Sequence, residues 1–177
     1  MAGCKIQAGT AYTERHNQVA GIVYRNICTV YGLDPPKSRW EIPQKVVEND
    51  RAKILWDFQI QADRQVLANQ PDIVVVDKDQ KTVVAIDVMV PSDSNIRKKE
   101  FEKQEKYQGL KKELKRNWKV KAKVVPVVVG ALGAVTPKLG DWLQQIPGTT
   151  LELSVQKSAW LGTAKILCRT PKLPGLW

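Results

Sequence analysis

The stretch PDIVVVDKDQKTVVAIDVMV, residues 71–90, decides the fold of this 177-residue chain. Two runs within it, residues 73–76 and 82–90, consist largely of β-branched and other apolar residues, which predicts strands buried on both faces. The polar residues 77–81 between them suit a hairpin turn. We therefore expect an antiparallel pair of strands near the centre of a β-sheet.

This hairpin brings two carboxylates together. If the turn is centred between Asp79 and Gln80, Asp72 lies directly opposite Asp87, with Cβ atoms about 4.5–5.5 Å apart on one face. Two ionised carboxylates at this distance repel, so the arrangement favours a cation between them. Their oxygen atoms suit Mg²⁺, which can activate water and stabilise charge on a phosphate during hydrolysis. A shift of one residue would place the aspartates on opposite faces.

A long helix is expected at about residues 95–118, after the cap-forming residues 91–94. Its buried stripe is predicted from apolar side chains at spacings of three and four: Tyr107, Leu110, Leu114 and Trp118. At about 100° per residue, Lys103 falls roughly 25° from the centre of this stripe and Lys106 roughly 85° from it. A lysine among apolar neighbours needs an anionic partner, such as the carboxylate pair or a substrate phosphate. The alternative is that the Lys103 ammonium extends past Tyr107 to water.

The remaining elements predict an α/β fold with a mixed central β-sheet flanked by helices. The proline-rich residues 34–37 are the best boundary, dividing an N-terminal helical segment, 1–36, from a main domain, 37–177. Periodicity and turn residues indicate these further elements: helices at 11–31, 136–146 and 156–168, and strands at 53–60, 120–129 and 151–155.

Positive charge is concentrated on one segment. The chain has 28 Lys and Arg against 18 Asp and Glu, a formal net charge of +10 at pH 7. Residues 97–123 alone contain 12 basic and 4 acidic side chains, a net charge of +8. Such a segment fits a polyanion partner or a solvated helix face equally well. If the partner is DNA, phosphate contacts are expected from Arg97, Lys98, Lys99, Lys111, Lys112, Lys115 and Arg116.

Several classes of protein are excluded by composition. The three cysteines are far apart and odd in number, which argues against a disulfide framework. No apolar run reaches the roughly 18 residues of a membrane span, and the first residues lack the apolar region of a secretory signal. The single histidine, His16, excludes a multi-histidine metal site. We expect a soluble intracellular protein without a membrane partner.

Three motifs together carry a family resemblance: NQPDIVV at 69–75, AIDVMVP at 85–91 and EKQEKY at 102–107. The combination resembles the restriction-like, PD-(D/E)xK endonuclease domain at the C-terminal end of non-LTR retrotransposon polyproteins. The later stretches VVPVVVGAL at 124–132 and LGTA at 161–164 are also similar, so the likeness covers nearly the whole chain.

The resemblance implies a restriction-endonuclease-like core that nicks double-stranded DNA in the nucleus with Mg²⁺ or Mn²⁺, with element RNA as a second partner. By position, Asp72 and Asp87 would be metal ligands, and Lys103 and Tyr107 would orient the water or the phosphate. Met89 stands where the usual motif has lysine, which implies that the lysine has moved to the next helix. The catalytic lysine stays open between Lys103 and Lys106.

The N-terminal segment resembles the remnant of a zinc-knuckle region. Cys4 and His16 look like its last half, but two ligands do not make a tetrahedral zinc site, so Zn²⁺ is not expected. The preferred interpretation is a free thiol at Cys4 and a histidine that caps or packs a helix. Because no reverse transcriptase sequence is present, the chain would be a fragment or a captured copy. The alternatives to a nuclease are therefore a catalytically inactive DNA-binding relic and a structural fragment without activity.

Overall fold

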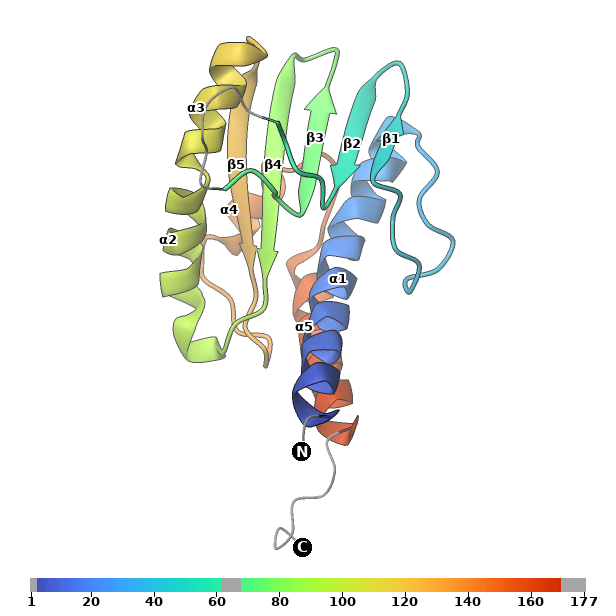
Figure 1. Ribbon diagram of the computed structural model, residues 1–177, viewed down its shortest axis with the longest axis vertical. Coiled ribbons are helices and arrows are strands. Elements are labelled where there is room, and N and C mark those ends of the chain that lie inside the picture. Colours follow the sequence, from blue (N-terminus) through green and yellow to red (C-terminus); the bar gives the residue numbers. More distant parts are fainter. Residues whose placement is uncertain (1–2, 62–67, 170–177) are drawn as a thin grey trace, which may run out of the picture.

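The computed structural model describes residues 3–61 and 68–169 (Figure 1). Within them, five strands form one mixed sheet in the order β1-β2-β3-β4-β5. β4 and β5 are parallel, and the other neighbouring strands are antiparallel. The strands are β1 (Val46–Glu48), β2 (Ala52–Trp56), β3 (Ile73–Asp77), β4 (Thr82–Met89) and β5 (Lys121–Val128). The predicted α/β fold with a mixed sheet flanked by helices is confirmed.

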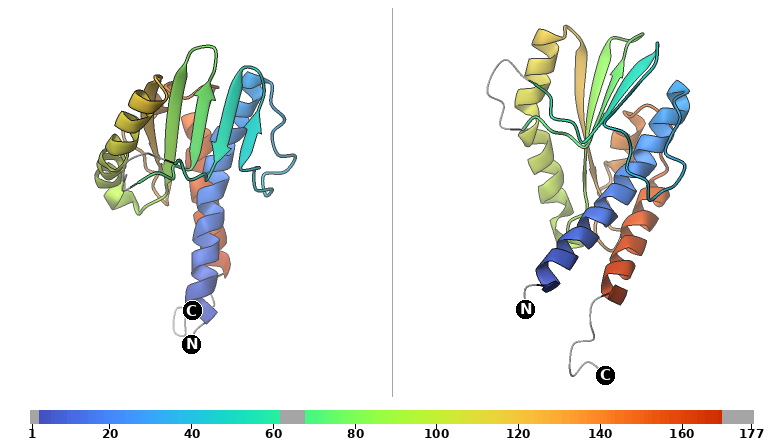
Figure 2. Two further views of the ribbon diagram at one scale, coloured as in Figure 1. Left: turned by 45° about the horizontal axis from the view of Figure 1, so that its top comes forward. Right: turned by 45° about the vertical axis from the view of Figure 1, so that its right-hand side comes forward.

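Helices cover both faces of the sheet, and Figure 2 shows the two layers in its right-hand view. One face carries α2 (Ile96–Lys106) and α3 (Gln108–Asn117), which follow the short 3₁₀ helix η1 (Asp93–Asn95). The other face carries α1 (Gly3–Tyr31), α4 (Leu139–Gln144) and α5 (Glu152–Arg169). Each layer buries its own apolar cluster against the sheet, which is why the central strands consist of valine, isoleucine and alanine on both faces.

α1 lies in the predicted N-terminal segment and packs directly on the sheet. Its Val19, Val23 and Ile27 are fully buried in the same cluster as Ile73 and Ile86. α1 and α5 lie side by side, and their outer ends extend beyond the sheet (Figure 1). No helix in the described part of the chain is long and apolar enough to cross a membrane.

The register of the central hairpin is the predicted one. Ile73 pairs with Ile86, and Asp77 pairs with Thr82 next to the turn. Asp72 precedes β3 by one residue and therefore comes next along the ladder, opposite Asp87. Lys81 adopts a positive φ of 50°, which closes the turn.

The predicted helix at 95–118 is interrupted. It divides at Tyr107, whose φ and ψ of −101° and 9° end α2 before α3 begins. The Tyr107 side chain is 1% exposed, and its hydroxyl bonds to Gln70 and Asp87 on the sheet side. These contacts hold Tyr107 against the sheet at the point where the helix is interrupted. Leu110 and Leu114 are buried as predicted, but Trp118 is 41% exposed, so including it in the stripe was wrong.

The strand predicted at 151–155 is also wrong, because α5 already begins at Glu152. The apolar residues there fit a helical spacing as well as an alternation, and the buried positions Val155, Ala159 and Gly162 follow the helical one. α1 extends further towards the N-terminus than predicted, β2 ends at Trp56, and β1 was not predicted. The helix predicted at 136–146 is shorter, because α4 runs only from Leu139 to Gln144.

Candidate active site

The two aspartates of the hairpin lie between the helical layers, where β4 ends and β3 begins. Asp87 projects from β4 towards α2 and is 3% exposed. Asp72 precedes β3, and its side chain keeps 21% exposure. Because Asp87 pairs with Pro126 in the parallel β4–β5 ladder and lies one step beyond the Ile73–Ile86 pair, its position is fixed by the same pairing that builds the sheet.

Asp87 is contacted by two side chains from the covering helices. The Lys103 ammonium forms an ion pair with its Oδ2 atom, and the Tyr107 hydroxyl lies 2.9 Å from its Oδ1 atom. That hydroxyl also lies 3.0 Å from the carbonyl oxygen of Gln70, so its proton is shared between two acceptors. Burial, and then the negative charge of Asp72, raises the pKa of Asp87 above its ordinary value. The site thus holds a carboxylate that favours a positive charge beside it.

Asp72 is contacted by a residue that the sequence did not single out for this site. The backbone N–H of Val88 donates to Asp72 Oδ2 at 2.6 Å, and His16 Nε2 from α1 lies 3.2 Å from the same oxygen. Nε2 also lies 3.1 Å from the Val88 carbonyl oxygen, and Nδ1 lies 3.1 Å from Asn17 Oδ1. Burial alone would lower the pKa of His16, but its hydrogen bond to Asp72 and the charge of Asp72 outweigh it and raise the pKa to about 9.

A signal for His16 is present in the sequence. His16, Val19, Val23 and Ile27 follow one another at spacings of three, four and four, so the histidine extends the buried stripe of α1. It therefore faces the sheet rather than solvent, and its partner there is Asp72.

The two candidate lysines occupy different environments. Lys103 is 15% exposed and pairs with Asp87, as expected for a lysine near the buried stripe. Lys106 is exposed, with its Nζ atom 4.8 Å from the centroid of the Tyr107 ring and 3.2 Å from the Tyr107 hydroxyl. The structure therefore brings Lys103, and not Lys106, against the carboxylates; which of the two is catalytic stays a prediction.

The basic residues predicted to contact phosphates are divided by the break at Tyr107. Those on α2 are Arg97, Lys98 and Lys99, and those on α3 are Lys111, Lys112, Lys115 and Arg116. All are exposed except Lys99 and Lys111, which are half-buried. Three are paired within their own helix: Lys98 and Lys99 with Glu102, at 4.0 and 2.5 Å, and Arg116 with Glu113 at 2.6 Å.

The donor set determines which metal the site suits. No three His, Cys, Asp or Glu side chains within residues 3–61 and 68–169 form a ready metal cage, so a closed structural site is not built here. Two carboxylates are nevertheless what Mg²⁺ commonly takes from a protein, with water and substrate phosphate as the other ligands. The buried Oδ2 atom of Asp87 is already paired with the Lys103 ammonium, so a metal ion at this carboxylate would share it with that lysine. The Cys4 side chain lies outside the described part.

Comparison with known proteins adds little to this geometry. No protein-family model matches the chain, and no curated protein matches it. A solved structure of an N-terminal domain of a reptarenavirus L protein is similar, with 15% sequence identity and a TM-score of 0.40. The similarity covers 93% of this chain and 68% of that one.

Proposed function

We propose that this protein is a metal-dependent nuclease that hydrolyses phosphodiester bonds of DNA at Asp72 and Asp87. The observation that carries the proposal is the convergence of these carboxylates, from adjacent strands, with a lysine of the covering helix. A buried carboxylate paired with a lysine beside a second carboxylate serves stability poorly, because desolvation offsets much of the attraction. The same arrangement is well suited to hold a cation and a phosphate.

Asp72 and Asp87 would hold Mg²⁺ or Mn²⁺. When bound, the ion would supply an activated water and offset charge on the phosphate. Tyr107 is a positioning residue in this scheme, because its hydroxyl fixes the orientation of the Asp87 carboxylate. His16 and the Val88 N–H do the same for Asp72.

Lys103 supplies a fixed positive charge. Its ammonium lies against Asp87, where a phosphate held by the same carboxylates would come within reach. Charge on the phosphoryl oxygens increases towards the transition state, and a preorganised cation in a water-poor site stabilises it there more than in the ground state. Lys103 is therefore the better candidate for the catalytic lysine.

Duplex binding is assigned to the outer surfaces of α2 and α3. Contacts from their exposed basic residues to phosphates would give binding that weakens strongly with salt and reads little sequence. The proposal extends to the family suggested by the motifs, a restriction-like endonuclease domain of a non-LTR retrotransposon polyprotein. It would act in the nucleus, with element RNA as a second partner.

The test is nicking of supercoiled plasmid with Mg²⁺, with Mn²⁺ and with EDTA. Asp72→Asn and Asp87→Asn keep the shape of the side chains and remove their charge, so both should abolish metal-dependent nicking. Asp79→Asn is the matched control, because Asp79 is 64% exposed and lies in the turn at the other end of the hairpin. Nicking that persists in EDTA, or in Asp72→Asn at the unaltered rate, would overturn the proposal.

A second candidate is a DNA-binding module that does not cleave. It is favoured by the basic helices, which do not depend on the carboxylates, and by the lack of a ready three-ligand cage in the described residues. In that case every metal condition would leave the plasmid intact, while a gel shift would still show salt-sensitive binding of duplex DNA.

A further inference from the structure

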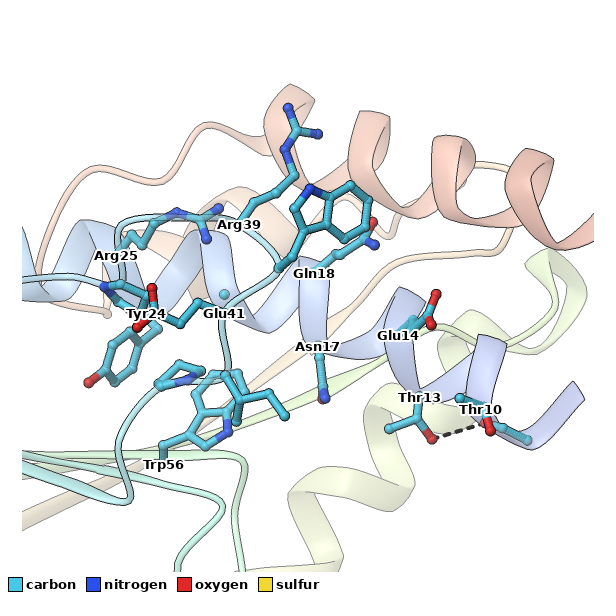
Figure 3. A pocket seen from close by; sticks show the side chains of 16 residues that line it. Thr10, Thr13, Glu14, Asn17, Gln18, Tyr24, Arg25, Arg39, Glu41 and Trp56 are labelled. Atoms are coloured by element: carbon cyan, nitrogen blue, oxygen red, sulfur yellow. Dashed lines mark hydrogen bonds between the residues drawn. The ribbon is translucent and has the colours of Figure 1, made fainter. Parts of the chain in front are cut away.

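A cavity of about 570 Å³ lies beside α1. Its walls are one side of α1, the loop at residues 36–43 and Trp56 at the end of β2. Tyr24 and Trp56 close its inner end, with their rings in edge contact at 5.5 Å between centroids (Figure 3). Trp40 lies on the loop and remains 59% exposed, with Arg39 and Lys165 near its ring. Tyr24 and Trp56 are 1% and 4% exposed, so the aromatic surface open to a planar ring is that of Trp40.

A second hollow of about 440 Å³ adjoins the first and shares Gln18, Arg25 and Arg39 with it. It also contains Lys157 of α5, and none of the residues that line it is acidic. Arg25 lies along α1 (Figure 3). Its Nη1 atom is 3.3 Å from the point where a Cβ atom on Gly21 would lie, so the absence of a side chain at Gly21 leaves room for the guanidinium.

Three cations thus meet in the second hollow without a carboxylate between them. Within the described part of the chain, no ion pair joins Arg25, Arg39 or Lys157 to an acid. Burial and the charge of Arg39 lower the pKa of Arg25, as expected for two guanidinium groups that repel. An anion between them would remove the repulsion, and arginine forks match the oxygen atoms of a phosphate.

The acidic residues of the larger cavity already have partners. Glu14 pairs with Lys165 at 3.8 Å and with Arg169 at 3.1 Å. Glu41 accepts the backbone N–H of Lys37 at 3.1 Å. Neither carboxylate therefore acts as the counter-ion of the arginines, and neither lines the second hollow.

We propose that the two hollows together bind one unpaired nucleotide of a DNA strand, with its base against Trp40 and its phosphate on Arg25 and Arg39. Aromatic surface beside an uncompensated cation cluster matches the two halves of a nucleotide. This inference rests on the proposed nuclease function for the source of the strand. It adds a substrate class: DNA with a single-stranded segment next to the cleaved bond.

Contacts connect the cavity to the carboxylate site from two sides. Asn17 lines the cavity, and its side chain contacts His16, which in turn contacts Asp72. Trp56 lines the cavity, and the next residue, Asp57, donates its N–H to the Asp72 carbonyl oxygen at 2.7 Å. The cavity and the carboxylate site are therefore joined through His16 and Asn17 on one side and through residues 56 and 57 on the other.

The test measures binding in EDTA, so that cleavage does not contribute. The probes are a fluorescein-labelled twelve-nucleotide oligothymidylate, a blunt duplex and thymidine monophosphate as competitor. Trp40→Ala should weaken binding of the single strand about 5- to 100-fold, the usual range for a lost base–aromatic stack. Arg39→Gln should weaken it and lower the slope of log affinity against log salt by about 0.7. Blunt-duplex binding should change less than about twofold in both.

Two controls match these variants. Trp160→Ala removes a similarly exposed tryptophan, 53% exposed on α5, and Arg51→Gln removes an exposed arginine; neither residue lines the hollows. Single-strand affinity that is unchanged in Trp40→Ala and Arg39→Gln would overturn the nucleotide site. Monophosphate binding as tight as oligonucleotide binding would overturn the assignment to a strand. If no metal condition gave nicking while the oligothymidylate still bound and lost affinity in Trp40→Ala, the nuclease proposal would fail and the nucleotide site would stand, so the two failures are distinguishable.

Discussion

Replacing each candidate lysine by methionine separates their roles. Methionine retains most of the apolar stem and removes the ammonium. Lys103 is 15% exposed and pairs with Asp87, so Lys103→Met removes the one side-chain cation that contacts the buried carboxylate among the described residues. The loss of a preorganised charge at a transition state typically lowers the rate about 10²- to 10³-fold. We expect a fall of this size in the rate of metal-dependent nicking.

Lys106→Met should behave differently. Lys106 is exposed and its ammonium lies over the Tyr107 ring, an interaction that contributes about 0.5–1 kcal/mol at exposed sites. Its removal should change the nicking rate less than about tenfold. The assay is single-turnover conversion of supercoiled to nicked plasmid with protein in excess, so that DNA affinity does not limit the rate.

A folding measurement accompanies both variants. Lys103→Met leaves Asp87 buried without its cation, which should cost about 3–5 kcal/mol of unfolding free energy in EDTA. Thermal melts give a shift of roughly 2–4 °C per kcal/mol for a chain of this length. The reasoning is refuted if Lys106→Met loses as much activity as Lys103→Met, or if folded Lys103→Met nicks at the original rate.

Three further predictions concern the same site. Tyr107→Phe removes a hydroxyl 2.9 Å from Asp87 and should lower the unfolding free energy by about 1–3 kcal/mol in urea titrations; an unchanged midpoint would contradict that contact. In EDTA, the stabilisation by His16 should be complete below about pH 6.5 and decline as the pH rises through its raised pKa of about 9, so the difference in melting temperature between the original protein and His16→Gln should shrink over that interval; a difference that grows with pH would be the wrong sign. Mg²⁺ at 100 times its dissociation constant should add about 2.7 kcal/mol of stability, measured as a higher melting temperature that Asp87→Asn does not show; an equal shift in both proteins would place the ion elsewhere.

The central hairpin could be predicted in detail from the sequence because its signals are local. The β-branched runs, the five-residue polar turn and the buried faces all require one register, and Ile73 pairs with Ile86 as that register demands. The secondary structure near the C-terminus was harder to predict from the sequence. Residues 151–155 fit a strand and a helix equally well over so short a run, and only packing against α1 decides for the helix.

The candidate site could likewise be predicted from the sequence only in part. The opposition of the two aspartates follows from the turn, and the approach of Lys103 follows from the helical period, so both were accessible from the sequence. His16 is 56 positions from Asp72, and their contact depends on how α1 crosses the sheet. The break at Tyr107 likewise depends on a hydroxyl reaching the sheet, which periodicity does not encode.

A double replacement distinguishes a catalytic ion pair from a structural one. Asp87 shares its face of β4 with Ala85, which is 1% exposed, and the strand consists mainly of β-branched and apolar residues, so a valine there would fit the strand. Replacing a buried ion pair by apolar residues of similar size is often neutral or stabilising by about 1–4 kcal/mol, because it removes two desolvated charges.

We therefore expect Asp87→Val combined with Lys103→Met to unfold at or above the original temperature in EDTA, while metal-dependent nicking is lost. The Tyr107 hydroxyl keeps the Gln70 carbonyl oxygen as an acceptor at 3.0 Å, so the replacement leaves it bonded. Lys103→Met alone should be less stable than the double variant, since it leaves the Asp87 charge uncompensated. If the double variant were instead the least stable of the three proteins, the pair would be holding the fold together. The presence of the Asp87–Lys103 pair would then be explained by stability alone, without a role in catalysis.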